Sequence, residues 1–447
     1  MADVTVRGGT LVTPGGPTRA DLAIDGELIT TIAPELPAGD ADIDARGLLV
    51  LPGLIDVHLH FNEPGRTEWE GAATGSRALA AGGGTLFFDM PLNSTPCTLN
   101  AREFDRKRAA LEAASITDFA LWGGLVPGSV PEMSELADRG VVGFKAFMCD
   151  SGLPEFPRAD DVTLLEGMRE AARLGLPVAV HAESEELTKA LSARMTRRDA
   201  RDFLDSRPLI AELDAIQRAL LFARDTGAAL HIVHVSSGQG VALAVEARAA
   251  GVDVSVETCA HYLFFTDEDM VRIGVAAKCA PPLRPAQEQQ ALWDSVMRGD
   301  VDIVASDHSP TTPAMKGGDF AAAWGGIAGV QSTLAVLLDR GLHARSLPIE
   351  QVAALVATRP AHRFRIQGKG SLRTGMHADL ALIDPSESCT LTEADLFQRH
   401  KMSPYVGSTF RGTVRRTIRR GETIFADGRI VATGHGTLIR PDASGRT

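Results

Sequence analysis

Eight short apolar runs that alternate with helix-like segments constrain the fold of this chain more than any other feature of its sequence. The runs cover residues 54–58, 85–90, 119–124, 141–147, 177–183, 230–236, 252–258 and 301–306. Between two of them, residues 160–174 begin with aspartates, repeat apolar residues at a helical period and stop before Gly175. Eight strands, nearly all followed by helices, predict an α/β fold of the (β/α)8 barrel type. A doubly wound parallel sheet is the alternative, but eight units in about 300 residues match a barrel better.

Both ends of the chain have a different pattern, in which short alternating segments are broken by Gly and Pro. Residues 3–50 predict antiparallel strands with turns at Gly8-Gly9 and Asp25-Gly26. Residues 377–434 repeat this pattern, with turns at Arg420-Gly421 and Asp427-Gly428. We therefore expect a barrel of residues 52–370 and a small β-sandwich domain built from residues 1–51 and 371–447.

The charge balance excludes some classes of partner. The chain has 447 residues, with 45 basic and 57 acidic side chains and a net charge of −12, which argues against nucleic acid and anionic membranes. One basic run, residues 411–420, is interpreted as a solvated edge strand. Five widely spaced cysteines indicate reduced thiols. Because the first ten residues carry no signal pattern and no apolar run approaches eighteen residues, we expect a cytoplasmic protein without a membrane partner.

Nitrogen and oxygen donors stand at the ends of five predicted strands, where the catalytic residues of a barrel gather. His58 and His60 are two residues apart in a strand, so their side chains share a face. Singly, each donor has an ordinary explanation, such as a packed histidine, an outward lysine or a helix cap. Together they predict a two-metal site. The six donors are His58, His60, Lys145, His181, His234 and Asp307.

Lys145 is the unexpected member of this set, because an ammonium group has no lone pair to give a metal. Its apolar neighbours Val142 and Phe144 favour the uncharged amine. Reaction of that amine with carbon dioxide would give a carbamate, which supplies two anionic oxygens. We therefore expect Lys145 to be carboxylated and to bridge two metal ions.

Six segments resemble motifs of the cyclic amidohydrolases, the family of dihydroorotases, hydantoinases (dihydropyrimidinases) and allantoinases. They are PGLIDVHLHFNEPG, GFKAF, VHAES, LHIVHVSS, ETCAHY and SDHSP, in the family's order and spacing. The resemblance implies His58, His60 and Asp307 on one metal, His181 and His234 on the other, and carboxylated Lys145 between them. It also implies a homotetramer. Histidine and carboxylate ligands suit zinc, our expectation, as well as cobalt, iron or manganese.

Within this family, the surroundings of the site are most similar to the allantoinase branch. Dihydroorotases have arginine where this chain has Asn62, and hydantoinases have tyrosine where it has Asp150. The segments MPLN, EFPRADD, AWGGIAG and RHKMSPYVG are similar to allantoinases, whereas Ala260 and Ala280 depart from the family's usual proline and serine. The resemblance implies hydrolysis of allantoin to allantoate, with a hydantoinase-like or dihydroorotase-like cyclic amidase as the alternative. A non-enzymatic scaffold is a further alternative, against which the complete donor set argues.

Ring opening requires water to attack an amide carbonyl. We expect hydroxide held between two metals to attack, and Asp307 to act as general base and then as general acid. Candidate substrate contacts are Asn93, Ser309, Trp324, Gly325 and Gly326. A turn, a helix cap or plain packing is the alternative explanation for the first three of them.

Overall fold

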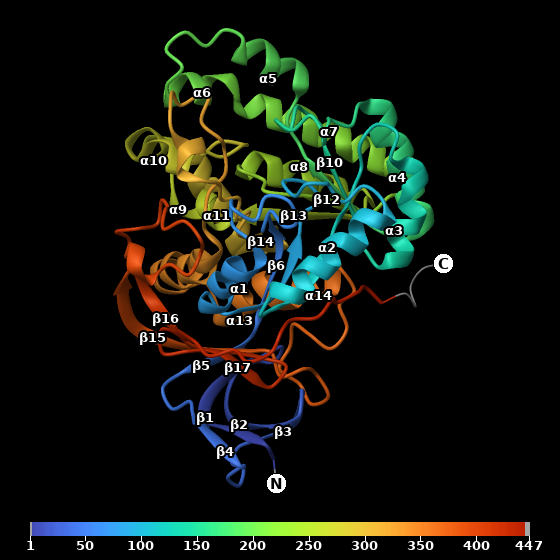
Figure 1. Cartoon of the computed structure of the whole chain (residues 1–447). Coiled ribbons are helices and arrows are strands. Elements are labelled where there is room, and N and C mark those ends of the chain that lie inside the picture. The colour runs from blue at the N-terminus through green and yellow to red at the C-terminus, as the bar shows by residue number, and fades with distance from the viewer. Residues whose placement is uncertain (1, 443–447) are drawn as a thin grey trace.

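The computed structural model describes residues 2–442, and its centre is the predicted barrel, surrounded by helices (Figure 1). The barrel strands all pair in parallel and coincide with the eight apolar runs, beyond which none extends by more than one residue. They are β6 (Leu54–Leu59), β7 (Gly84–Asp89), β8 (Asp118–Leu121), β9 (Gly123–Gly124), β10 (Phe144–Phe147), β11 (Val178–His181), β12 (Leu230–Ile232), β13 (Val254–Cys259) and β14 (Ile303–Ala305). β8 and β9 share one run and are separated by Trp122, whose indole Nε1 donates to the Val57 carbonyl at 3.0 Å.

Hydrogen bonds between neighbouring strands close the barrel. The continuous ladders run β6-β7-β8 and β9-β10-β11-β12-β13-β14. A parallel bridge between Leu59 and His308 joins β6 to the residues after β14, and the Val142 amide donates to the Leu121 carbonyl at 2.9 Å at the other gap. Alternate strand positions fill the interior with apolar side chains, as in other barrels. These include Ile55, Val57, Leu86, Phe88, Ala120, Ala179, Val233, Ile303 and Ala305.

The helices cover the outside of the barrel or lie in its loops. They are α1 (Ala72–Ala81), α2 (Ala101–Ala114), α3 (Met133–Arg139), α4 (Asp161–Leu174), α5 (Glu185–Ser192), α6 (Ala200–Ser206), α7 (Leu209–Thr226), α8 (Gly238–Ala249), α9 (Ala260–Phe264), α10 (Asp267–Ile273), α11 (Ala286–Arg298), α12 (Thr333–Val336), α13 (Ile349–Ala353) and α14 (Arg359–Arg363). None of the helices within residues 2–442 is both long and apolar enough to cross a membrane.

Helix α4 confirms the predicted start and stop signals. The Asp160 carboxylate accepts the Thr163 amide at 2.8 Å, which satisfies one of the free N–H groups of the first turn. Gly175 ends the helix at φ 65°, a left-handed conformation that glycine adopts without steric cost. Leu164, Met168 and Ala171 form the buried face between these ends.

Strands from both termini form one sheet, at the bottom of Figure 1. They are β1 (Val4–Thr13), β2 (Gly16–Asp25), β3 (Leu28–Ala33), β4 (Ala41–Asp44), β5 (Leu49–Pro52), β15 (Leu380–Thr390), β16 (Thr409–Arg419), β17 (Glu422–Ala426) and β18 (Arg429–Ile430). The order is β18-β17-β16-β15-β5-β1-β2-β3, with β4 paired to β1. The predicted turns after Asp25, Arg420 and Asp427 are confirmed, and each contains a glycine at positive φ.

Three details of the predicted sheet are wrong. Gly8 and Gly9 form a bulge inside β1 instead of a turn, because Gly9 lies so close to β5 that a Cβ would be 2.8 Å from Val50 Cγ2. β4 and β5 pair in parallel with β1, not antiparallel to it. The basic run 411–420 is no edge: most of it lies in β16, between β15 and β17.

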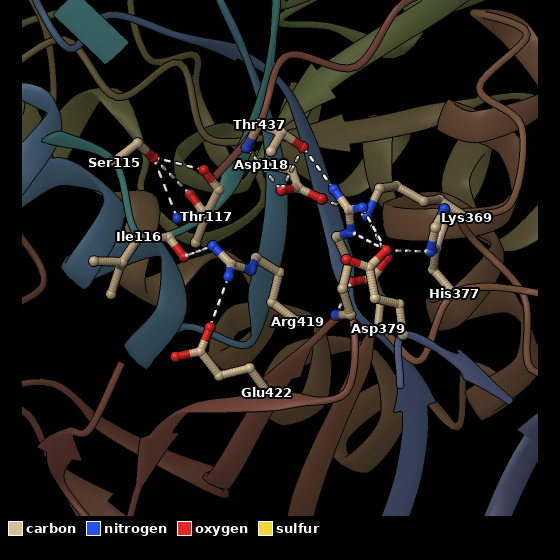
Figure 2. Close-up of polar contacts among 12 residues, drawn as sticks. Ser115, Ile116, Thr117, Asp118, Lys369, His377, Asp379, Arg419, Glu422 and Thr437 are labelled. Atoms are coloured by element: carbon tan, nitrogen blue, oxygen red, sulfur yellow. Dashed lines mark hydrogen bonds and ion pairs between the residues drawn. The ribbon is translucent and has the colours of Figure 1, made fainter. Parts of the chain in front are cut away.

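Buried ion pairs explain how this basic strand is accommodated inside the sheet (Figure 2). Arg419 is only 6% exposed and donates from Nη1 to the Ile116 carbonyl at 2.9 Å and from Nη2 to Glu422 at 2.7 Å. Nearby, Lys369 Nζ lies 2.8 Å from Asp118 and 2.5 Å from Asp379. Burial opposes the charge of Lys369, but these two carboxylates together raise its pKa. Since Asp118 begins β8 and Asp379 precedes β15, this lysine connects the barrel to the sheet.

Candidate metal centre

The loops after the barrel strands surround a cavity of about 820 Å³. Five of the six predicted donors line it, namely His58, His60, His181, His234 and Asp307. The five candidate substrate contacts line the same cavity: Asn93, Ser309, Trp324, Gly325 and Gly326. The structure therefore brings the predicted metal ligands and the predicted substrate contacts together in one place. Lys145, the sixth donor, is 1% exposed.

One group of donors is arranged around Asp307. Its Oδ1 lies 3.3 Å from His58 Nε2 and 3.6 Å from His60 Nε2, and this group is compact enough to hold a metal ion. Burial alone would raise the pKa of Asp307, but its interactions with His58 and His60 hold it well below its usual range. Burial lowers the pKa of His60 to about 4. An ionised carboxylate beside a neutral imidazole is the protonation state that metal binding requires.

His181 and His234 form the second group of donors. Their ring centroids are 4.6 Å apart, and the His234 ring is 5.4 Å from that of His58. Burial lowers the pKa of His181 and holds that of His234 well below its usual value. Both rings are therefore neutral at ordinary pH, with a nitrogen lone pair available.

Lys145 is buried without an acceptor. Its Nζ has no hydrogen-bond partner among the described residues and lies 5.0 Å from the centroid of the Phe147 ring. Burial lowers the pKa of its ammonium to about 8. An unsatisfied buried nitrogen that is readily deprotonated fits the chemistry of carboxylation, which converts the amine into an anionic ligand.

Two buried glutamates that the sequence interpretation did not assign hold the histidines in place. Glu257 accepts from His58 Nδ1 at 2.8 Å and from His231 Nε2 at 3.1 Å, and it also accepts the main-chain amide of His234 at 3.1 Å. Since Nδ1 of His58 is occupied, Nε2 is the nitrogen that faces Asp307.

Glu183 has the equivalent role beside His181. It lies 2.8 Å from His181 Nε2 and accepts from Arg207 Nη1 at 2.5 Å. Although burial would raise its pKa, Arg207 and His181 lower it to about 2, so the carboxylate is ionised. A carboxylate two residues after a candidate ligand histidine was a signal in the VHAES motif that could have identified Glu183.

Four residues other than glycine at this end of the barrel have strained main-chain conformations. Asn62, Asn93, His234 and Asp307 have φ values of 63°, 67°, 41° and 42°, which residues other than glycine rarely adopt. Such strained positions cluster at functional sites, where the surrounding structure holds them. They set the direction in which His234 and Asp307 leave the main chain.

The candidate substrate contacts are packed closely against one another. Asn93 Nδ2 donates to Ser309 Oγ at 3.4 Å. Gly326 has φ 123°, and a Cβ there would lie 2.2 Å from the Ser309 carbonyl oxygen. Trp324 makes an edge contact with Trp69, with 5.1 Å between ring centroids. Glycine is therefore required at 326, where it lines the cavity.

We predict that Glu257→Gln weakens metal binding about 10- to 100-fold, the range typical of residues that orient ligand histidines. A glutamine lacks the negative charge and has one acceptor oxygen in place of two. Competition with a chelator measures the metal affinity. Glu212→Gln is the control, because Glu212 is equally buried but binds Ser236 and Arg284 instead of a ligand histidine. Equal affinities for the two variants would contradict the role of Glu257.

His261 generates a prediction about pH. It is 1% exposed, neither ring nitrogen has a partner within residues 2–442, and burial lowers its pKa to about 4. In the unfolded chain a histidine takes up its proton near pH 6.5. Below that pH the unfolded state therefore binds a proton that the folded state does not bind until about pH 4, and stability falls.

Lowering the pH from 7 to 5 should cost the parent protein about 2 kcal/mol of unfolding free energy relative to His261→Gln. Urea unfolding of both proteins at each pH measures this difference. The comparison cancels the contribution of the other titrating groups, and identical pH dependences would show that the pKa of His261 is the same in the folded and the unfolded chain.

Residues 49–424 match the family described as the Amidohydrolase family. Curated relatives resemble the chain over nearly its whole length. It is 62% identical to an allantoinase from Solibacter usitatus, over 99% of this chain and 98% of that protein. It is 58% identical to an allantoinase from Rubrobacter xylanophilus, over 98% of both chains.

Solved structures agree with this relationship. The fold matches an L-hydantoinase (dihydropyrimidinase) from Arthrobacter aurescens with a TM-score of 0.95 and 32% identity, covering 98% of this chain and 100% of that one. It matches a dihydropyrimidinase from Brevibacillus agri with a TM-score of 0.92 and 27% identity, covering 99% of both. The family match and these relatives span both the barrel and the sheet, and on that basis the chain belongs to the amidohydrolase family.

Proposed function

We propose that this chain is an allantoinase, which adds water across a ring amide of allantoin and gives allantoate. The observation that carries the proposal is the identity of 52–62% to three allantoinases over at least 98% of the chain. The cavity supplies the chemistry that the reaction needs, because it combines candidate metal ligands with polar groups that suit a flat, hydrogen-bonding ring.

We propose that His58, His60 and Asp307 hold one divalent ion and that His181 and His234 hold a second. Carboxylated Lys145 would lie between them. The compact group around Asp307 and the unsatisfied Nζ of Lys145 support this assignment. Zinc suits these ligands best, and cobalt, iron or manganese also fit a set of imidazoles and carboxylates.

Two such ions would lower the pKa of a bound water and polarise the amide carbonyl. The protein's own contribution is proton transfer. Asp307, ionised in the fold, takes a proton from the attacking water and delivers it to the departing ring nitrogen as the C–N bond breaks. The new carboxyl group carries the second proton of the water and loses it to solvent, so each turnover releases one proton.

The cavity wall positions the ring for this attack. Asn93 and Ser309 offer hydrogen-bonding groups on one side, and the main chain of Gly325 and Gly326 can approach the ring closely. Trp324 supplies a flat apolar face. Holding the carbonyl beside the nucleophile in this way provides much of the rate of such reactions.

A hydantoinase-like activity is the second candidate. The L-hydantoinase whose structure matches this fold with a TM-score of 0.95 acts, according to its name, on the same type of ring. Allantoin differs from hydantoin by its ureido group, so a comparison of allantoin, hydantoin, dihydropyrimidine and dihydroorotate as substrates separates these activities.

We further propose a homotetrameric, cytoplasmic enzyme with a barrel of residues 52–370 and a second domain of residues 1–51 and 371–447. The five cysteines are free thiols, which supports a reducing compartment. The sheet order supports the domain division, since strands from both termini pair with one another.

The metal-loaded protein should turn over racemic allantoin faster than the other three substrates, with one proton released per turnover. Asp307→Asn should lower kcat by about 10²- to 10⁴-fold, because it removes the proton carrier. Proton release measures the rate, and metal content is quantified on the same samples. Faster turnover of hydantoin than of allantoin would favour the second candidate.

Carboxylation of Lys145 can be tested separately. In ¹³C-labelled bicarbonate, the parent protein should give a carbamate carbon resonance that is absent from Lys145→Arg. Lys145→Arg keeps the positive charge and most of the volume but cannot form the carbamate. A resonance of equal strength in both proteins, or an unmodified lysine in the active metal-loaded enzyme, would contradict this assignment.

A further inference from the structure

Residues 321–326 form the part of the cavity wall that carries Trp324 and the two glycines, and a lysine from another segment holds this wall. Lys278 follows the short helix η2 (Gly274–Ala277). Its Nζ donates to the main-chain carbonyls of Phe320, Ala321 and Ala323 at 2.8, 3.0 and 2.6 Å. An ammonium group has three protons, so all of them are used by this one stretch of main chain.

The surroundings of Lys278 lack the usual partner of a buried cation. Its side chain makes no ion pair among residues 2–442, although the residue is only 5% exposed. The rings of Phe203 and Phe320 have their centroids 4.8 and 5.5 Å from Nζ. By contrast, Lys369 neutralises two carboxylates. The charge of Lys278 therefore interacts with carbonyl dipoles and aromatic rings. These interactions fix the shape of the wall.

Further hydrogen bonds extend this attachment to Gly326. The Gly326 amide donates to the Lys278 carbonyl at 2.7 Å, and Lys316 Nζ donates to the Gly326 carbonyl at 2.7 Å. Both the amide and the carbonyl of Gly326 are thus hydrogen-bonded. Gly326 is in close contact with the main chain of Ser309. A displacement of the wall would therefore also displace Ser309, which lies two residues after Asp307.

On its solvent-exposed side, the segment of residues 319–324 is attached more weakly. Asp319 pairs with Arg198 at 2.8 Å, but their side chains are 45% and 50% exposed. Exposed ion pairs contribute little, because solvent screens them and ordering two long side chains costs entropy. The buried contacts of Lys278 are therefore the main attachment of residues 319–324.

We propose that Lys278 is a positioning residue that holds Trp324, Gly325 and Gly326 against the substrate. It acts by holding the wall in place. All three protons of its ammonium group are donated to main-chain carbonyls, so none remains for a hydrogen bond to the substrate. The substrate in this inference is the one named under the proposed function, whereas the attachment of the wall is independent of it.

Lys278→Met is the kinetic test. The methionine keeps the volume and the contact with the phenyl rings but donates no hydrogen bond. The KM for allantoin should rise about tenfold or more with a smaller change in kcat, because a displaced wall loses substrate contacts. Metal content should be unchanged. Asp319→Asn, which breaks the exposed ion pair on the same segment, is the control and should keep the parent KM.

Trypsin gives a readout that does not depend on activity. Lys316 is the only basic residue within 312–326 and is 7% exposed in the fold. Lys278→Met should be cut after Lys316 at least about ten times faster than the parent protein, since cleavage requires this segment to open. Mass spectrometry of the fragments identifies the cut, and Asp319→Asn should be cut at the parent rate.

A second pair of variants keeps the proposal testable if Lys278→Met does not fold. Lys278→Gln can donate two hydrogen bonds, and Lys278→Arg keeps the cation but cannot converge on three carbonyls with one nitrogen. Both should show intermediate increases in KM and cleavage. Parent values for both variants would overturn the proposal. Failure of the parent protein to hydrolyse allantoin, with rapid cleavage of the variants, would overturn only the proposed function.

Discussion

The geometry of the site depends on one carboxylate, that of Glu257. It accepts from a ring nitrogen of His58 and from the main-chain amide of His234, so it contacts both groups of donors. It is completely buried, and burial alone would raise its pKa. The surrounding imidazoles of His58 and His231 instead lower it to about 2, and the carboxylate stays ionised. Through this single anion, the ends of β6 and β12 keep a fixed distance and orientation.

Three buried lysines show how the same side chain serves different purposes in one protein. Lys369 has two carboxylates and links the barrel to the sheet. Lys278 has three carbonyls and shapes the cavity wall. Lys145 has no acceptor among the described residues. A buried cation without a partner is costly, and this cost is the physical basis for our proposal that Lys145 is carboxylated.

The barrel and the donors at its mouth could be predicted from the sequence because both are local patterns. An apolar run predicts a strand, and the residue at its end lies at the mouth whatever the rest of the chain does. Glu257 could not be found in this way. Its role depends on its place beside His58, which lies 199 positions earlier in the chain, and no period within either segment encodes that contact.

The errors in the sheet have the same origin. A run of arginines predicts an exposed strand, but Arg419 is buried, and the Ile116 carbonyl and Glu422 accept from its two terminal nitrogens. The parallel pairing of β1 with β4 and β5 depends on how the chain crosses over, which the alternation of apolar residues does not specify. The wall held by Lys278 also joins segments some 45 residues apart.

The contacts of residues 436–439 have a consequence for the order in which the protein is made. The Gly436 amide donates to the Ser115 carbonyl and the Ile439 amide to that of Phe119, beside the start of β8. The side chain of Asp118 also accepts the Thr437 amide. A ribosome releases these residues more than 300 positions after the strand that they cover. The start of β8 therefore lacks these partners until residues 436–439 have been made, which leaves main-chain groups of Ser115 and Phe119 exposed while the intervening segments are synthesised.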